Sequence, residues 1–382
     1  AAGSICASGT LGQIIPPSIE LVFLGDQLSV AYMEAQREIG NFAPDPISVG
    51  DLFAGALIPG VGLACLYMIY QAIIGILKPE YCPPAPRSAG DDEPVLPLLA
   101  SLVPPLFLII AVLGSILMGI ATPTAAAGVG ALGGTLLAGL QMSKSNDASR
   151  SLIRKLVLAA IIGAFALPVL RASGDLRMTL DVVTPFNQAL IGLALLACLA
   201  LLIGTFAALY ALARAAQLQH VVTETMRVST LAFAILIGAT IFSLTFRAFG
   251  GEEVVTHAME KIPGGPIGAL LAVSLLVFIL GFFLDFIEIV FIIMPIVAPV
   301  ILQSDINPIW FGVLIAMNLQ TSFLTPPFGF ALFYLRGVAP PEVTTGDIYR
   351  GVLPFIGIQL FALAMVFTFP ALATWLPTVI FR

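Results

Sequence analysis

Two clusters of small and hydroxyl residues surround Pro-Pro pairs in otherwise apolar parts of this 382-residue chain. The first pair lies within GTLGQIIPPSIELVFLG (residues 9–25) and the second within LQTSFLTPPFGFALFYLRG (residues 319–337). A proline removes a backbone donor and its ring clashes with the preceding turn, so each pair should interrupt a helix. An interrupted helix exposes carbonyls that can bind Na⁺ and amides that can bind a carboxylate. Both segments are therefore predicted to bind ions.

The candidate ligands are the small and oxygen-bearing residues near each break. Near the first break they are Ser8, Gly9, Thr10, Gly12 and Ser18, and near the second they are Asn318, Gln320, Thr321, Ser322, Thr325 and Gly329. A hydroxyl in such a place can instead satisfy a backbone group that the break leaves free, because lipid offers no other partner. Both interpretations stay open for each residue, and ion binding is the prediction for each cluster as a whole.

Carboxylates within apolar sequence form a second group of candidates. Asp285 and Glu288 lie inside GFFLDFIEIV, three residues apart and so on one helical face. An ionisable group is costly in a bilayer, which favours cation binding or proton relay over the alternative of a solvated hairpin tip. Glu20 follows Pro17 by three residues, whereas Phe330 takes that place in the second segment. Glu20 is expected to line the cavity or to lie at its aqueous edge.

A similar element follows each break. SVGDLFAGALIPG (residues 48–60) follows the first and TTGDIYRGVLPF (residues 344–355) the second, and both contain a hydroxyl residue two positions before Gly-Asp. An internal duplication of this kind is typical of secondary transporters, although coincidence in a Gly/Pro-rich membrane protein is the alternative. Asp51 and Asp347 are expected to cap helix N-termini. The first copy would carry an extra polar loop over roughly residues 26–45.

The composition predicts an all-α polytopic membrane protein. Hydrophobic residues are 59% of the chain and charged residues 10%, whereas a soluble domain has about 25% charged residues. The runs that reach the length of a membrane span are residues 52–77, 96–120, 152–170, 186–212, 228–249, 310–335 and 352–376. Residues 123–140 are rich in Gly and Ala and should pack closely against a neighbour. Residues 267–302 are too long for one span and contain no polar loop, which predicts a re-entrant helical hairpin.

The remaining segments are predicted connectors. They are residues 26–45, 78–93, 141–151, 171–181, 214–227 and 251–263, with a Pro-rich linker over residues 82–97. Lys144, Arg150, Arg154 and Lys155 form the densest cationic cluster, which predicts a cytoplasmic loop. The chain contains no Walker A, Gly-x-Ser-x-Gly or His-Glu-x-x-His sequence, and its four cysteines show no metal-ligand spacing. We therefore predict neither an enzyme nor a bound cofactor.

Several of these strings, in this order, resemble the large membrane subunit of tripartite ATP-independent periplasmic (TRAP) transporters. They are GTLGQIIPPSI, SVGDLFAGALIPG, GIATPTAAAGVGA, FFLDFIEIVFIIMPI, NLQTSFLTPPFGFALF and GDIYRGVLPF. The likeness is to the longer, mannitol/chloroaromatic-like subtype and spans nearly the whole chain. Residues 143–222 lack a counterpart in shorter members. Ala125 stands where the family usually has Glu after Thr-Pro-Thr, so the support that this Glu provides is absent here or comes from elsewhere.

The resemblance implies a Na⁺-coupled elevator of the ion transporter superfamily, in the bacterial inner membrane. Its fold would contain two inverted repeats, each with scaffold helices, a re-entrant hairpin and a broken helix. Its partners would be a small membrane subunit and a periplasmic substrate-binding protein that delivers the solute, usually an organic acid. Nucleic acid is not expected as a partner, and Na⁺ would be the coupling ion.

The resemblance also assigns candidate site residues. The first ion and substrate region would contain Thr10, Gly12, Pro16, Pro17 and Ser18, and the second would contain Asn318, Thr325, Pro326, Pro327 and Gly329. Asp285 would belong to the second hairpin, and Ser8, Thr321 and Ser322 complete the predicted site. The Na⁺ candidates are Thr10, Gly12, Ser18, Asn318 and Thr325.

The predicted organisation has three parts. Residues 1–79 would be the remainder of a first repeat, residues 80–225 a linker with scaffold helices and extra spans, and residues 226–382 the core of a second repeat. That core would contain the hairpin 267–302, the broken helix 310–335 and a final span 351–376. The sequence before the first break lacks the arm and return that precede the second. We therefore expect an N-terminally truncated chain that does not transport alone. Proton-coupled transport through Asp285 and Glu288, or a channel, is the alternative function.

Overall fold

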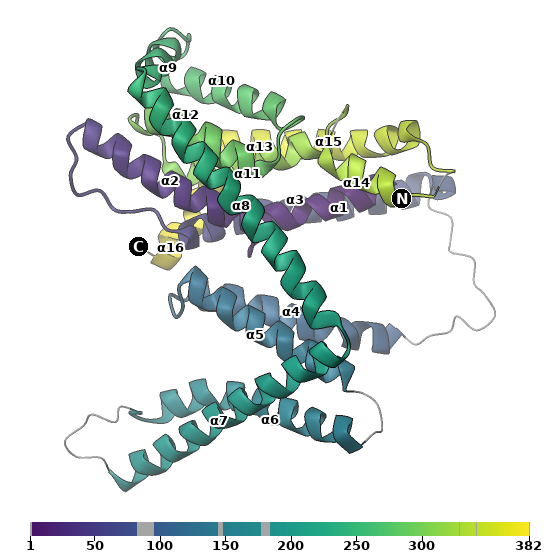
Figure 1. Ribbon diagram of the computed structural model, residues 1–382. Helices are drawn as coiled ribbons and strands as arrows, with labels where there is room; N and C mark the ends of the chain where they lie inside the picture. Colours follow the sequence, from purple (N-terminus) through teal and green to yellow (C-terminus); the bar gives the residue numbers. More distant parts are fainter. Residues whose placement is uncertain are drawn as a thin grey trace. The chain divides into compact units, whose positions relative to one another are not determined.

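The computed structural model describes residues 2–81, 95–143, 148–176, 184–327, 329–340 and 342–381 (Figure 1). Throughout these ranges the regular secondary structure is helical. Seven helical segments there are long and apolar enough to cross a membrane, and a bent pair of helices gives an eighth candidate. The predicted class of an all-α polytopic membrane protein is thus confirmed. Most of the Pro-rich linker, and Lys144 of the cationic cluster, lie outside the described residues.

The chain divides into two compact units, the first of which contains Ala1–Asp91, Ile116–Ile120 and Leu231–Arg382. Segments from both ends of the sequence therefore pack together. Its helices before the linker are α1 (Ala2–Ile14), α2 (Ile19–Glu38), α3 (Val49–Leu77) and the short 3₁₀ helix Pro79–Tyr81. Its later helices are the end of α8 (Gln217–Ala248), α9 (Gly251–Glu260), α10 (Gly265–Leu280), α11 (Phe286–Glu288), α12 (Met294–Leu302), α13 (Pro308–Leu324), α14 (Phe330–Val338), α15 (Thr345–Thr368) and α16 (Ala371–Phe381).

Helix α13 forms the centre of this unit. It is buried on all sides, since 16 of its 17 residues are buried, and it packs against α1, α2, α3, α10 and α15. Asn307 caps its N-terminus, since Oδ1 accepts hydrogen bonds from the amides of Ile309 (2.9 Å) and Trp310 (3.1 Å). The indole Nε1 of Trp310 donates to the carbonyl of Val366 at 2.8 Å and ties α13 to α15. These contacts fix the helix that leads into the second break.

Both helices that contain a Pro-Pro pair are interrupted there, as the sequence predicts. Helix α1 ends at Ile14 and α2 begins at Ile19, while α13 ends at Leu324 and α14 begins at Phe330. The bonds between Pro16 and Pro17 and between Pro326 and Pro327 are cis. Helices α1 and α2 together count as one candidate span of 37 residues. The second broken helix is shorter, because α14 has only 9 residues.

The apolar segment before the second broken helix folds back on itself. Helix α10 runs to Leu280, and the chain turns before Asp285 starts α11. A five-residue π-helix, Ile289–Ile293, then leads into α12, which packs against α10 and α2. Helices α9 and α10 meet at 117°, a sharp bend that allows the pair to form a broken span or a re-entrant loop.

The duplicated Gly-Asp element forms the same capping box twice. In α3 the Asp51 amide donates to Ser48 Oγ at 3.1 Å, and Asp51 Oδ2 accepts from the Ser48 amide at 2.8 Å. In α15 the corresponding distances between Thr344 and Asp347 are 3.2 and 3.0 Å. Each box satisfies two backbone donors at a helix start. The two aspartates thus serve helix N-termini as predicted, at the third helical position rather than at the cap itself.

Three predicted boundaries are wrong because polar residues on a helix lower its mean hydropathy, and a fourth because a proline ends a helix. The expected loop over residues 26–45 is helical to Glu38, residues 214–227 are helical from Gln217, and residues 251–263 contain α9. The apolar residues of α9 gather on one face, against α10 and α12. The expected single span over residues 351–376 ends at Thr368, since Pro370 has no amide hydrogen with which to continue the helix.

The second unit contains Asp92–Ser115 and Ala121–Thr230. Its helices are α4 (Val95–Leu117), α5 (Pro123–Met142), α6 (Ala148–Ser173), α7 (Pro185–Arg214) and the start of α8. The Gly/Ala-rich helix α5 packs closely as predicted, since a Cβ on Gly139 would lie 2.5 Å from Cβ of Ala208 on α7. Thr122 caps α5 and Pro123 starts it, so a turn between helices explains the Thr-Pro-Thr sequence.

Candidate functional site

One cavity in the first unit joins three of the segments singled out from the sequence. Its volume is about 610 Å³, and its walls come from α1, the hairpin turn and the second broken helix. It is lined by Ile5, Cys6, Gly9, Thr10, Gln13, Asp285, Phe286, Phe323, Phe330, Ala331, Tyr334, Leu335 and Val338. Segments separated by about 270 residues in sequence therefore share one space.

Helix α1 contributes small and polar side chains to this cavity. Thr10 is buried and its hydroxyl donates to the Ala7 carbonyl at 3.0 Å. The side-chain oxygen Oε1 of Gln13 is buried and accepts no hydrogen bond within the described part of the chain. The thiol of Cys6 donates to the Ala331 carbonyl at 3.6 Å and links α1 to α14. Cys6 and Gln13 were missed in the sequence, although both lie on the face of α1 that carries Thr10.

The hairpin places Asp285 in the cavity wall. Asp285 caps α11, and its Oδ1 accepts from the Phe286 amide at 2.8 Å. Glu288 Oε2 in turn accepts from the Asp285 amide at 2.6 Å, which completes a capping box. Both side chains are half-buried, but only Asp285 belongs to the cavity lining. The pair therefore shapes the turn, and Asp285 is the member that can contact a ligand.

The amide of Asn318 and the hydroxyls near the end of α13 serve the packing of this helix. Asn318 Nδ2 donates to the Ser274 carbonyl on α10 at 2.6 Å. The hydroxyls of Thr321, Ser322 and Thr325 each donate at 2.7 Å to a carbonyl three or four residues earlier. These side chains satisfy backbone groups, which is the structural role that the sequence left open. The second break faces the cavity instead with Phe323 and Phe330, whose rings meet edge to face at 5.7 Å.

The other predicted site residues lie around the breaks without lining the cavity. Ser8 is exposed and donates to the Ser4 carbonyl, and Gly12 and Pro17 are also exposed. Pro16 is buried, and Ser18 is buried as the cap of α2, where Oγ accepts from the Leu21 amide at 3.4 Å. At the second break Pro326 is half-buried, and the exposed Pro327 accepts a hydrogen bond from the Tyr349 hydroxyl at 2.6 Å. Gly329 is buried, and a Cβ there would lie 2.7 Å from the Phe323 carbonyl oxygen.

Two further polar side chains near the breaks are buried without partners. Glu20 is 1% exposed, and neither carboxylate oxygen accepts a hydrogen bond from the residues that the structure describes. Gln320 is also 1% exposed, and both its amide atoms lack partners among the described residues. The sequence singled out both positions, and the alternative of Glu20 at an aqueous edge is wrong because the side chain is enclosed.

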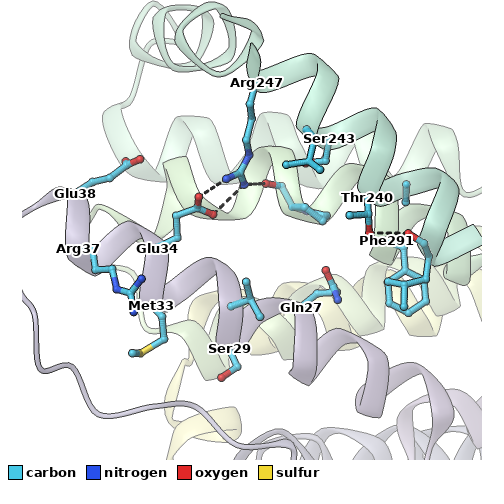
Figure 2. A pocket seen from close by; sticks show the side chains of 15 residues that line it. Gln27, Ser29, Met33, Glu34, Arg37, Glu38, Thr240, Ser243, Arg247 and Phe291 are labelled. Atoms are coloured by element: carbon cyan, nitrogen blue, oxygen red, sulfur yellow. Dashed lines mark hydrogen bonds and ion pairs between the residues drawn. The ribbon is translucent and has the colours of Figure 1, made fainter. Parts of the chain in front are cut away.

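A second cavity, of about 690 Å³, lies between α2, the end of α8 and the return arm of the hairpin (Figure 2). Arg247 forms a two-pronged ion pair with Glu34, in which Nη2 donates to Oε2 at 2.9 Å. The same guanidinium reaches the Pro295 carbonyl at 3.4 Å. Side chains of α2 such as Gln27 and Ser29 also face this space. Polar side chains in the second half of α2 therefore line this cavity.

Long apolar helices, two of them broken beside a shared cavity, define a membrane transport protein rather than an enzyme. The model of the family described as "Tripartite ATP-independent periplasmic transporter, DctM component" matches residues 1–184 and 176–372. The chain therefore belongs to this family, the large membrane subunits of TRAP transporters.

Curated relatives agree with this family. The C4-dicarboxylate TRAP transporter large permease protein DctM of Vibrio cholerae is 27% identical over 380 residues, which are 100% of this chain and 68% of that protein. The protein of the same name from Pseudomonas aeruginosa is 24% identical over 98% of this chain and 67% of its own length. The sialic acid TRAP transporter permease protein SiaT of Haemophilus influenzae is 29% identical over 40% of this chain and 25% of that protein. The chain thus spans about two thirds of the length of the first two relatives.

Proposed function

We propose that this chain is part of the transport subunit of a TRAP system that takes up an organic acid together with Na⁺ across a bacterial inner membrane. The observation that carries the proposal is the shared cavity bounded by α1, the Asp285 turn and the second broken helix. The relatives named above are called transporters of C4-dicarboxylates and of sialic acid, both organic acids. A small membrane subunit and a periplasmic binding protein that delivers the solute are the proposed partners.

The two breaks suit different ions. The first break presents acceptor oxygens, namely Gln13 Oε1 and the carboxylate of Glu20 close by, which are hard ligands of the kind that Na⁺ prefers. The second break presents the start of α14, where Gly329 provides no side-chain cap for the first amides. Free amides at a helix N-terminus attract a carboxylate. We therefore assign the cation to the first break and the carboxylate of the solute to the second.

Transport would follow from the position of the hairpin. The turn at Asp285 closes the cavity on one side, and it belongs to an arm that packs on α13 through α10. Na⁺ bound at the first break would reduce the negative charge near this turn and allow the anionic solute to enter. Movement of the loaded site as a body across a fixed scaffold, an elevator, is the mechanism that we propose for the second half of the cycle.

The test is uptake by the full-length protein, reconstituted in liposomes with its small subunit and binding protein. A radiolabelled C4-dicarboxylate and sialic acid are the first solutes to try. Uptake that requires an inward Na⁺ gradient and disappears with K⁺ in its place is expected. Equal uptake in both salts would reject Na⁺ coupling.

Proton coupling through Asp285 and Glu288 is the competing function, and the same vesicles separate the two. An inward pH gradient without Na⁺ should drive no uptake if Na⁺ is the coupling ion. The variant Asp285→Asn should reduce uptake more than Glu288→Gln, since only Asp285 lines the cavity. Uptake driven by the pH gradient alone, and lost in both variants, would establish the proton alternative.

A further inference from the structure

Glu20 is the most unusual ionisable residue of the first unit. Its side chain is 1% exposed, and both carboxylate oxygens lack a hydrogen-bond donor among the described residues. Burying an ionised carboxylate is strongly unfavourable unless another charge or several donors compensate it. Asp285 caps α11, which packs on α2, so the neighbouring charge has the same sign and makes the burial less favourable. A bound proton or a bound cation must therefore neutralise Glu20.

Capping of α2 does not explain Glu20. An acidic residue in the first turn can stabilise a helix through the amides that it accepts from. Here Ser18 already serves the first turn: its hydroxyl accepts from the Leu21 amide at 3.4 Å, and its carbonyl accepts from the Val22 amide at 3.1 Å. Glu20 makes neither bond. Its carboxylate is thus not used in capping the helix.

Gln13 adds a second buried oxygen at the first break. Gln13 Oε1 is buried without a donor in the described chain, and Ser18 hydrogen-bonds the Gln13 carbonyl, which brings the two sides of the break together. Gln13 and Asp285 line one cavity, whose lining does not include Glu20, and α2 packs on α11, the helix that Asp285 caps. Two carboxylates and one amide oxygen from three segments form a hard, negatively charged ligand set.

We propose that Glu20 is a ligand of a monovalent cation, bound at the first break with help from Gln13 Oε1 and Asp285. The inference rests on the Na⁺ coupling proposed above and assigns it to a residue of this chain. The second break has Phe330 in place of Glu20, so it lacks this site. The bound cation balances the buried charge of Glu20. Its release on the opposite side of the membrane leaves this charge uncompensated, which favours rebinding of a cation.

The experiment measures the thermal midpoint of the purified full-length protein while NaCl replaces choline chloride at constant ionic strength. Na⁺ that binds the folded state raises the midpoint by mass action. The variant Glu20→Gln should lose this response, with at least a tenfold higher Na⁺ concentration at half effect. In choline chloride it should unfold at a higher temperature than the wild type, because the uncompensated charge is gone. Glu20→Asp should keep a weakened response, and it serves as the second variant if the first does not fold.

Asp51→Asn is the matched control, because it alters a carboxylate that belongs to a capping box away from the cavity. It should lower the midpoint without changing the Na⁺ dependence. A wild-type response that Glu20→Gln retains would overturn the role of Glu20 and leave Na⁺ coupling intact. A wild type that does not respond to Na⁺ at all would overturn both proposals.

Discussion

Five of the 13 residues of α1 are buried before the first break, whereas 16 of the 17 residues of α13 are buried before the second. Counted back from the second proline of each pair, exposed Ser8 corresponds to Asn318, which is tied to α10, and Gln13 corresponds to Phe323. Counted forward, Glu20 corresponds to Phe330. Two copies of one motif have therefore separated in role: the second break is part of the packed core, and the first carries the unpartnered carboxylate of Glu20.

The largest effect is expected at the second break, from Gly329→Val. A Cβ at Gly329 would lie 2.7 Å from the Phe323 carbonyl oxygen and 3.0 Å from that of Thr325, so the backbone must shift. We expect a loss of about 3 kcal/mol in the free energy of unfolding, the upper range for overpacking. Ile19 holds the matching position and is 57% exposed, so Ile19→Ala should change little. Denaturation of the full-length protein in detergent measures both, and equal losses would refute the contrast.

The next effect tests the difference between Asn318 and Ser8. Asn318→Ala removes the hydrogen bond from a buried side chain to the half-buried Ser274 carbonyl and should cost about 1.5 kcal/mol. Ser8→Ala removes an exposed hydroxyl and should stay within about 0.5 kcal/mol of the wild type. The same denaturation curves serve here. A larger loss for Ser8→Ala would show that the first break is more structural than its burial indicates.

The duplicated capping boxes should behave alike. Ser48→Ala and Thr344→Ala each remove a hydroxyl that accepts a hydrogen bond from a backbone amide at the start of a helix. Each change should cost about 1 kcal/mol. Their thermal midpoints, measured side by side, should fall by similar amounts. If only one variant is destabilised, the two elements share a sequence without sharing a role.

The smallest effect concerns the helices that follow the breaks. Glu34→Gln removes the two-pronged pair between α2 and Arg247, whose side chains are about 30% exposed, and should cost about 0.5 kcal/mol, less at high salt. Arg336→Gln on α14 removes only an exposed hydrogen bond to the Val343 carbonyl and should have no measurable effect. Thermal midpoints of unfolding at low and high NaCl test both variants. If the effect of Glu34→Gln were the same at both NaCl concentrations, its electrostatic origin would be refuted.

Local chemistry in the sequence was enough to predict most of this fold. Proline pairs predicted both interruptions, and the hydroxyl-x-Gly-Asp pattern predicted both helix starts. The extent of α2 was missed because its second half is polar. Leu28, Ala31 and Ala35 nevertheless recur at helical spacing and are all buried, which is the signal that mean hydropathy concealed.

The site was less predictable, because it depends on which side of each helix faces the cavity. Thr10 and Asp285 were predicted and line the cavity, whereas Asn318, Thr321 and Ser322 were predicted and instead support α13. Sequence near a break shows that oxygen atoms are present, but not whether a nearby carbonyl already accepts their hydrogen. Cys6 and Tyr334 could not be found in this way, since they enter the wall through packing between α1 and α14.

The π-helix between α11 and α12 has a mechanical consequence. An α-helix turns by about 100° per residue, and a π turn holds an additional residue within one hydrogen-bonded loop. The tip of the hairpin, with Asp285, and the arm Met294–Leu302 are therefore set at different rotational phases about a shared axis. If the π turn shifted by one residue along Ile289–Ile293, the tip of the hairpin would rotate relative to the arm, while the arm stays packed against α2.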